Sequence, residues 1–521
     1  MVRKLSDVVA RERLGPISSA AEVAAADLVA RDAVRRMWTG DHTLWQDDPD
    51  EVADRLGWLF VAGEMADQVD DLEAFAGAAA ADGLRHAVLL GMGGSSLFPE
   101  VLWRTFGARP GCLDLRVLDT TDPAAIARVA TDFDLDACLF VVASKSGSTI
   151  ETTSQFAHFW EMTGGDGARF VAISDPDTEL ARLGHRQGFR RVFESRPDIG
   201  GRYSALSYFG LVPAALLGVD LTGLLEAAAA MAEATTVPET PGERHPALRL
   251  GAAMGASVLA GRDKLTIVLP REVGTFGLWL EQLVAESTGK NGTGAVPVVG
   301  EHLGQSADYG EDRLFVSVGF RPGLDDLAAV GHPVIELAYQ NPLELGGLIL
   351  VWEQAVALAG AVLGINPFDQ PDVAAAKAAT NSVLEVGLPP IDPVPLAGLL
   401  DQVGPGDYLA VQAFVDPGDE ELLGSLQRVR MVLRDRLKVA TTLGIGPRYL
   451  HSTGQLHKGG QPNGVFVQVV GDDKEDVAIP GAEYGFSALK QAQAAGDLLS
   501  LRGRGLRVGR VSLAEFLEVS E

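Results

Sequence analysis

The feature that most constrains the fold is a repeated local order: an apolar run, a polar glycine-rich loop, and then a helical pattern. It occurs in "HAVLLGMGGSSLFPEVL" and in "ACLFVVASKSGSTIETTSQFAHFW", and a third apolar run, "RFVAISD", follows. Strands that alternate with helices of about a dozen residues predict a doubly wound parallel sheet. Ligands of such sheets bind at the carboxyl ends of the strands, where both polar loops fall.

The same order continues along the chain and predicts further α/β units. "KLTIVLP", "RLFVSVGF" and "PVIELAY" predict strands after residue 245, and "FGLWLEQLVAE" predicts a helix. After the proline-rich "LPPIDPVPLAGLL", the runs "YLAVQAFV", "LGSLQRVRMVLRDRL" and "GVFVQVV" predict a smaller unit. We therefore expect a helical N-terminal segment over 1–60, α/β domains over 61–235 and 236–390, and an α/β extension over 391–521.

Composition narrows the class of protein. Of the 521 residues, 47% are apolar and 22% are charged, which is typical of globular proteins. The net charge of −27 argues against nucleic-acid or anionic-membrane binding. Two cysteines cannot form a disulfide framework, and the N-terminus shows no signal-peptide pattern, so we expect a cytoplasmic protein. The long apolar run around Glu353 and Gln354 is interpreted as a core helix, because a membrane span would not tolerate these residues at its centre.

The polar loops are candidate ligand sites, with structural alternatives. "SKSGST" (Ser144 to Thr149) suits a phosphate at a helix N-terminus, or is a cluster of N-capping hydroxyls. "GMGGSS" is either a ligand contact or a tight turn. In "DIGGRYSALS", Arg202 is either the partner of an oxyanion or a member of a salt bridge.

Further candidates lie in the second half of the chain. Gln370 and Lys377 are seven residues apart, and Lys377 is either a desolvated amine suited to proton transfer or an exposed lysine. His451 and His457 bracket the polar segment "HSTGQLHKGG". Glu286 ends a helical run before the polar loop of "EQLVAESTGKNGTG", where the helix dipole offers a carboxylate no stabilisation. No metal-ligand motif is present in the sequence.

Taken in order, five of these segments resemble the phosphoglucose isomerase (glucose-6-phosphate isomerase) family. They are "GMGGSSLFPE", "SKSGSTIET", "GGRYSALS", "EQLVAESTGK" and "FDQPDVAAAK". The resemblance implies two flavodoxin-like sugar-isomerase (SIS) domains with doubly wound parallel sheets, usually in a homodimer, and no cofactor. It implies interconversion of glucose 6-phosphate and fructose 6-phosphate through a cis-enediolate.

The resemblance also implies roles for residues. Glu286 would move the proton between C2 and C1, Arg202 would stabilise the enediolate, and Lys377 would assist ring opening. The residues expected to hold the open sugar and its phosphate are Gly94, Ser95, Ser144, Lys145, Ser146, Thr149, Gln282 and Gln370.

Two departures from the family pattern bear on the site. The family's ring-opening histidine follows a Gly-Gln pair, but "GEHLGQSADYG" has Ser306 there and His302 four residues earlier. The chain also continues well beyond the lysine motif, as in the isomerase part of transaldolase fusions, although no transaldolase barrel is expected. We hypothesise that the extension supplies the missing histidine, His451 or His457.

Two alternative functions stay open at this stage. Thr288 stands where the family has asparagine, so mannose 6-phosphate is an alternative or second substrate. A non-catalytic SIS protein that senses sugar phosphates is the other alternative. It predicts loss of the base, yet Glu286, Arg202 and Lys377 are all present.

Overall fold

Three sheets with the same winding order form the frame of the protein. The computed structural model describes residues 8–236 and 245–520. In these residues the sheets have the orders β3-β2-β4-β5-β6, β1-β10-β9-β7-β8 and β12-β11-β13-β14. Each contains four parallel strands in the flavodoxin-like order 2-1-3-4, so the winding direction reverses between the first and third strands of the set. The prediction of doubly wound α/β domains is confirmed.

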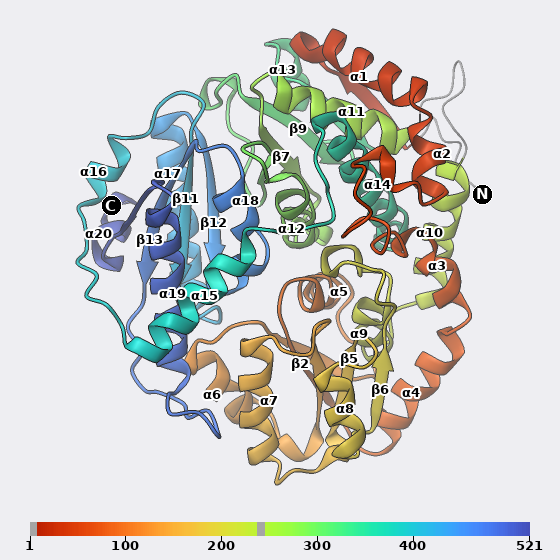
Figure 1. Cartoon of the computed structure of the whole chain (residues 1–521), viewed down its shortest axis with the longest axis vertical. Helices are drawn as coiled ribbons and strands as arrows, with labels where there is room; N and C mark the ends of the chain where they lie inside the picture. The colour runs from red at the N-terminus through yellow and green to blue at the C-terminus, as the bar shows by residue number, and fades with distance from the viewer. Residues whose placement is uncertain (1–7, 237–244, 521) are drawn as a thin grey trace.

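The first sheet and its helices form the lower part of Figure 1. Its strands are β2 (His86–Gly91), β3 (Asp114–Leu118), β4 (Cys138–Ala143), β5 (Phe170–Ser174) and β6 (Arg191–Glu194). The helices of this part are α3 (Trp58–Ala66), α4 (Val69–Ala81), α5 (Leu97–Phe106), α6 (Pro123–Asp132), α7 (Ile150–Met162), α8 (Glu179–Arg186) and α9 (Tyr208–Leu217). The next helix, α10 (Leu221–Thr236), packs against the core helix of the second unit in the upper part of the figure.

The second sheet includes a strand from the N-terminal segment that we expected to be helical. Its strands are β1 (Val9–Arg13), β7 (Lys264–Val268), β8 (Val296–Val298), β9 (Arg313–Val318) and β10 (Val334–Leu337). The helices are α1 (Ser18–Ala30), α2 (Ala33–Trp38), α11 (Pro246–Leu259), α12 (Phe276–Thr288), α13 (Leu324–Ala329) and α14 (Leu345–Leu363). β1 pairs antiparallel with β10, and Arg13 donates to Glu336 at 2.8 Å. Pairing with a distant strand therefore decides the conformation of this short segment.

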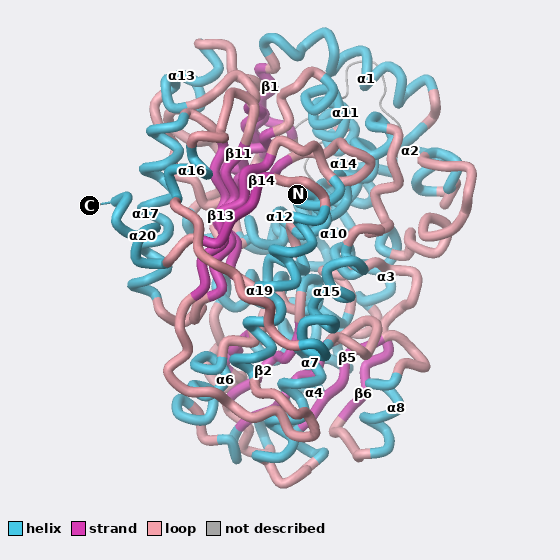
Figure 2. The backbone as a smooth tube through the Cα atoms, turned by 60° about the vertical axis from the view of Figure 1, so that its left-hand side comes forward, coloured by secondary structure: helices cyan, strands magenta, loops and turns pink. Residues whose placement is uncertain are grey.

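The third sheet lies in the extension, drawn in blue in Figure 1 and as the magenta strands β11, β13 and β14 in Figure 2. Its strands are β11 (Tyr408–Phe414), β12 (Ala440–Ile445), β13 (Gly464–Val470) and β14 (Arg507–Arg510). The helices are α15 (Val373–Val386), α16 (Leu396–Leu400), α17 (Glu420–Leu437), α18 (Gly454–Gly459), α19 (Phe486–Gly503) and α20 (Leu513–Leu517). α15 packs along α19, so the segment before residue 390 already contacts the extension. Division of the chain at residues 60, 235 and 390 stays a prediction.

The long apolar helix α14 is a core helix, as Glu353 and Gln354 predicted. Pro342–Leu363 is long and apolar enough to cross a membrane, but 94% of its most apolar window is buried inside the structure. Gln354 donates to Thr235 at 2.8 Å. Burial raises the pKa of Glu353 well above its usual value.

Candidate active site

The glycine-rich turn after β2 lies at the carboxyl edge of the first sheet and contacts two other parts of the chain. A Cβ on Gly94 would lie 1.9 Å from the carbonyl oxygen of Gly201. Gly93 has φ +55°, and a Cβ there would lie 2.9 Å from Nε2 of Gln282 and from the carbonyl oxygen of His451. Glycine is needed here because larger residues would push these segments apart.

Glu286 and Arg202 form the centre of the site. Glu286 lies in the last turn of α12 and is 4% exposed, and Arg202 is 3% exposed. Nη1 of Arg202 donates to Oε2 of Glu286 at 3.5 Å. Burial raises the pKa of Glu286, while Arg202, His451 and Lys290 act against that rise. A desolvated carboxylate beside a fixed cation is suited to remove a proton from carbon while negative charge develops nearby.

The segment that carries Gln370 holds Arg202 in place. Nη2 of Arg202 donates to the carbonyl oxygens of Pro367 and Asp369 at 2.7 and 2.9 Å. Nη1 also donates to Oε1 of Gln370 at 3.3 Å, and Nε donates to Oγ of Ser287 at 2.8 Å. Arg202 is therefore a buried, oriented cation. The structure is compatible with both interpretations of its sequence context, as the partner of an oxyanion and as a member of a salt bridge. α15 begins at Val373, so Gln370 lies before the helix.

Gln282 links the carboxylate to the extension. It lies one turn before Glu286 on α12, and its Nε2 lies 3.3 Å from Oε2 of Glu286 and 2.9 Å from the carbonyl oxygen of His451. Its Oε1 is buried and has no hydrogen-bond partner among the described residues. A buried amide oxygen without a partner is a position where a ligand hydroxyl can donate.

Lys290 is a neighbour of the site that the sequence analysis did not single out. Its Nζ donates to the carbonyl oxygen and to Oδ1 of Asp369 at 2.7 and 2.6 Å. Burial and the neighbouring Arg202 lower its pKa to about 8. Lys290 therefore fixes the same backbone segment as Arg202. The available signal was its place in the motif "ESTGK".

The extension brings His451 to the site. His451 ends the 3₁₀ helix Arg448–His451, and its Nε2 lies 2.8 Å from Oε1 of Glu151 at the start of α7. Glu151 is fully buried; burial acts to raise its pKa, but His451 lowers it on balance. This carboxylate was also missed, although it follows "SKSGSTI" directly.

His457, the other histidine of our hypothesis, points into the core of the extension and does not line the cavity that His451 lines. Its ring packs among Tyr408, Tyr449 and Phe466 in the extension, and Nε2 of Gln412 lies 3.3 Å from its Nδ1. Burial lowers the pKa of His457 to about 3, so the ring is neutral. His457 lies six residues after His451 on α18, and the geometry of this helix directs its side chain into the core. His302 is exposed near α17, and its carbonyl oxygen accepts from Arg434.

A cavity of about 130 Å³ lies beside His451. Its lining includes Lys377 on α15 and Ser148 and Thr149 before α7. Lys377 is exposed rather than desolvated, but it faces the same cavity as His451. The remaining lining residues are Ile150, Glu151, Thr380, Asn381, Leu450, Gln493 and Asp497.

The phosphate-loop candidates divide into two groups. Thr149 is the N-cap residue of α7 but makes no capping hydrogen bond with its side chain, and its Oγ1 lies 3.0 Å from Oγ of Ser144. Exposed Ser146 bonds Ser148 at 3.2 Å. Lys145 instead forms an ion pair with Asp175 and donates to the carbonyl oxygen of Pro197 at 3.0 Å, and it does not line the cavity. The N-terminus of α7 is thus open to an anion, whereas Lys145 is already paired.

The side-chain hydroxyl of Thr288 makes its hydrogen bonds with the backbone of α12 and of the loop that follows it. Its Oγ1 donates to the carbonyl oxygen of Val284 at 2.8 Å and accepts from the backbone of Ala295 at 2.9 Å. With both hydrogen bonds made and the side chain fully buried, Thr288 gives no structural support to a change of sugar specificity.

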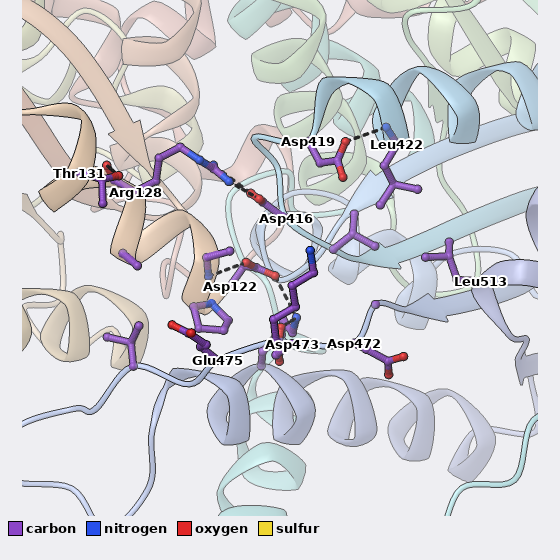
Figure 3. Close-up of a pocket in the computed structure, with 18 residues that line it drawn as sticks. Asp122, Arg128, Thr131, Asp416, Asp419, Leu422, Asp472, Asp473, Glu475 and Leu513 are labelled. Carbon is purple, nitrogen blue, oxygen red and sulfur yellow. Dashed lines mark hydrogen bonds and ion pairs between the residues drawn. The ribbon is translucent and has the colours of Figure 1, made fainter.

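A larger cavity, of about 560 Å³, lies between α6 and the extension (Figure 3). Arg128 donates to Asp416 across it, and Lys490 donates to Asp122 at 2.9 Å and forms an ion pair with Asp473. The Arg128–Asp416 and Lys490–Asp122 pairs fasten the extension to the first α/β unit, because each joins one residue from either side; the Lys490–Asp473 pair lies within the extension.

Comparisons with known proteins agree with the fold of the first two doubly wound units. The family model "Phosphoglucose isomerase" matches residues 39–312. A glucose-6-phosphate isomerase of Rubrobacter xylanophilus is 30% identical over 57% of this chain and 82% of its own. One of Gloeothece citriformis is 28% identical over 59% of this chain and 67% of its own.

Solved structures show the same fold. A hypothetical protein of Thermus thermophilus, TT0462, has a TM-score of 0.60 at 25% identity and covers 72% of this chain and 100% of its own. A glucose-6-phosphate isomerase of Chlamydia trachomatis has a TM-score of 0.59 at 19% identity, over 71% of this chain and 86% of its own. The fold and the site thus define an SIS-type α/β protein. The chain belongs to the phosphoglucose isomerase family.

Proposed function

We propose that this protein interconverts glucose 6-phosphate and fructose 6-phosphate. The observation that carries the proposal is the buried carboxylate of Glu286, 3.5 Å from the fixed guanidinium of Arg202 and hydrogen-bonded by Gln282. Aldose–ketose isomerisation needs such a group, because one proton must move between adjacent carbons while charge develops on oxygen.

In this proposal Glu286 removes the proton from C2 and returns it to C1. Arg202 stabilises the negative charge of the cis-enediolate, and its bonds to the backbone around Pro367 keep it oriented without substrate. Because burial raises the pKa of Glu286, the carboxylate is a stronger base than an exposed glutamate, and its cationic neighbours Arg202, His451 and Lys290 act against that rise.

His451 and Lys377 are assigned to ring opening. They face one cavity from the extension and from α15, and this common position supports the choice of His451 over His457. Ser144, Ser146 and Thr149, with the N-terminus of α7, are proposed to hold the phosphate; Lys145 would need to leave Asp175 to join them. Gly94, Ser95, Gln282 and Gln370 are proposed to contact the sugar. A homodimer and a cytoplasmic location stay predictions.

The test is to incubate the purified chain with glucose 6-phosphate in D₂O and to monitor the products by NMR. A parallel reaction contains mannose 6-phosphate as a competing substrate. We expect fructose 6-phosphate with solvent deuterium at C1, because a carboxylate exchanges its proton while the enediolate exists. Binding of glucose 6-phosphate without conversion would instead support the sugar-phosphate sensor. Preferred conversion of mannose 6-phosphate would overturn the assigned specificity.

A further inference from the structure

Helix α19 of the extension presents three polar side chains along one face. Lys490, Gln493 and Asp497 are spaced three and four residues apart, so they lie on the same side of the helix. All three are buried. Lys490 donates to Asp122, Gln493 donates to Glu151, and Asp497 accepts from Lys458 and Tyr449. One helix of the extension thus contacts both the first α/β unit and Tyr449 in the short helix that ends at His451.

Gln493 shares its acceptor with His451. Its Nε2 lies 2.7 Å from Oε1 of Glu151, and Nε2 of His451 lies 2.8 Å from the same oxygen. Both donors come from the extension, while Glu151 belongs to α7. The second oxygen of Glu151 is buried and has no hydrogen-bond partner among the described residues. Among the described residues, His451 and Gln493 are thus the two side chains that hydrogen-bond to Glu151.

The orientation of the Gln493 amide is fixed from its other side. Oγ1 of Thr121 donates to Oε1 of Gln493 at 2.7 Å, and both residues are buried. A flipped amide would place its oxygen 2.7 Å from the carboxylate of Glu151, which is repulsive because both atoms are acceptors. Thr121 and Glu151 together admit only one orientation.

This arrangement also selects the tautomer of His451. An ionised carboxylate can only accept, so the proton of the neutral ring lies on Nε2 and Nδ1 carries the free lone pair. Among the described residues, Nδ1 of His451 makes no hydrogen bond. The other charged groups near this pair are Lys377 on α15, Glu286 on α12 and Asp497 on α19.

We infer that Gln493 is a positioning residue that holds Glu151 and thereby sets the tautomer and orientation of His451. The inference rests on the proposed function, since it concerns the histidine assigned to ring opening. It makes α19, which the family model does not match, a working part of the site.

The experiment compares Gln493→Leu, Gln493→Glu and Thr121→Val with Gln412→Leu. Gln412 is the matched control, because it is another buried glutamine of the extension and bonds His457 outside the site. The readouts are the pH profile of kcat/KM for glucose 6-phosphate and the NMR tautomer and titration of His451, assigned by comparison with His451→Gln.

For Gln493→Leu we expect kcat/KM to fall about ten-fold to a hundred-fold, as when a charged acceptor loses one hydrogen bond. The titration of His451 should move to higher pH, because the charge of Glu151 is less dispersed and favours the imidazolium. Gln493→Glu should also lower kcat/KM, because two adjacent buried carboxyl groups share one proton and disturb the acceptor of His451. Thr121→Val should have the smallest effect, since Gln493 is still present.

Profiles and titrations of the Gln493 variants that coincide with those of the wild type and of Gln412→Leu would overturn the inference. A wild-type chain that binds the sugar phosphate but does not isomerise it would refute the proposed function instead. The NMR titration would then still decide whether Gln493 controls His451. Thr121→Val guards against misfolding, because it nearly keeps the shape of the side chain and leaves Gln493 and Glu151 in place.

Discussion

The part of the chain matched by the family and the extension have the same winding order but contribute to the site in different ways. The first two units place Glu286, Arg202 and the phosphate loop through local motifs at the ends of helices and strands. The extension contributes His451 from a short 3₁₀ helix and Gln493 from the face of a long helix. Under the proposed function, the residues of proton transfer belong to the first part, and the histidine of ring opening comes from the extension.

The largest effect is expected for Glu286→Gln in the first part. Loss of the base should lower kcat by at least about 10³-fold while sugar-phosphate binding persists, because the amide keeps the shape but cannot accept the proton. Stopped-assay kinetics and calorimetric binding measure the two quantities. Glu353→Gln is the matched control: Glu353 is also a buried helical carboxyl, but it lies in the core helix α14, so its amide should leave kcat unchanged. An active Glu286→Gln enzyme would refute the assigned base.

A smaller effect is expected for His451→Ala in the extension. Ring opening should slow by about 10²-fold, whereas turnover of an open-chain substrate should stay close to the wild-type rate, because proton transfer at carbon uses Glu286. Rapid-quench kinetics with cyclic and open-chain substrates separate the two steps. Equal losses on both substrates would mean that His451 is not confined to ring opening.

His457→Ala should change stability rather than catalysis. Its ring fills space among Tyr408, Tyr449 and Phe466, so truncation leaves a cavity and costs about 2–4 kcal/mol of unfolding free energy. Urea unfolding measures this loss. Steady-state kinetics of the folded variant should match the wild type on cyclic substrate, and a selective loss there would return His457 to the site.

The contact between α12 and the extension should depend on pH through Glu281. Burial raises the pKa of Glu281 to about 7, and Ser452 of the extension donates to it at 3.5 Å. The folded state therefore binds the proton of Glu281 more tightly than the unfolded state does. The resulting contribution to the free energy of unfolding is full below about pH 4.5 and is lost as pH rises toward 7. The loss is about 3 kcal/mol at most. In Glu281→Gln, the plot of unfolding free energy against pH should be flatter over this range. An unchanged slope would contradict the assignment of this pH dependence to Glu281.

Sequence alone predicted the parts of the site whose chemistry is local. Glu286, Gln282 and Arg202 were found because each lies in a compact motif, and the structure brings these three together with Gln370. Glu151 and Gln493 were not found, because their contact joins residues 342 positions apart and no local pattern predicts it. The same reason explains why spacing could not choose between His451 and His457.

The fold was predicted to the same extent. Long apolar strands such as β2, β4 and β9 were recognised, and the core helix α14 was interpreted correctly. Short or polar strands, among them β8 with the sequence "VPV" and β14 with "RVGR", carry too few apolar residues to be recognised. β1 is defined only by its pairing with β10.

The most direct test of the account is a crystal structure of the chain with a linear sugar-phosphate inhibitor that mimics the open enediolate. We expect the carboxylate of Glu286 to lie against the carbons equivalent to C1 and C2, with Arg202 at the charged oxygen. We also expect the phosphate at the N-terminus of α7 and the His451 ring beside the oxygen that closes the sugar ring. An inhibitor bound with its enediolate end away from Glu286, or with His451 turned out of the site, would contradict this account.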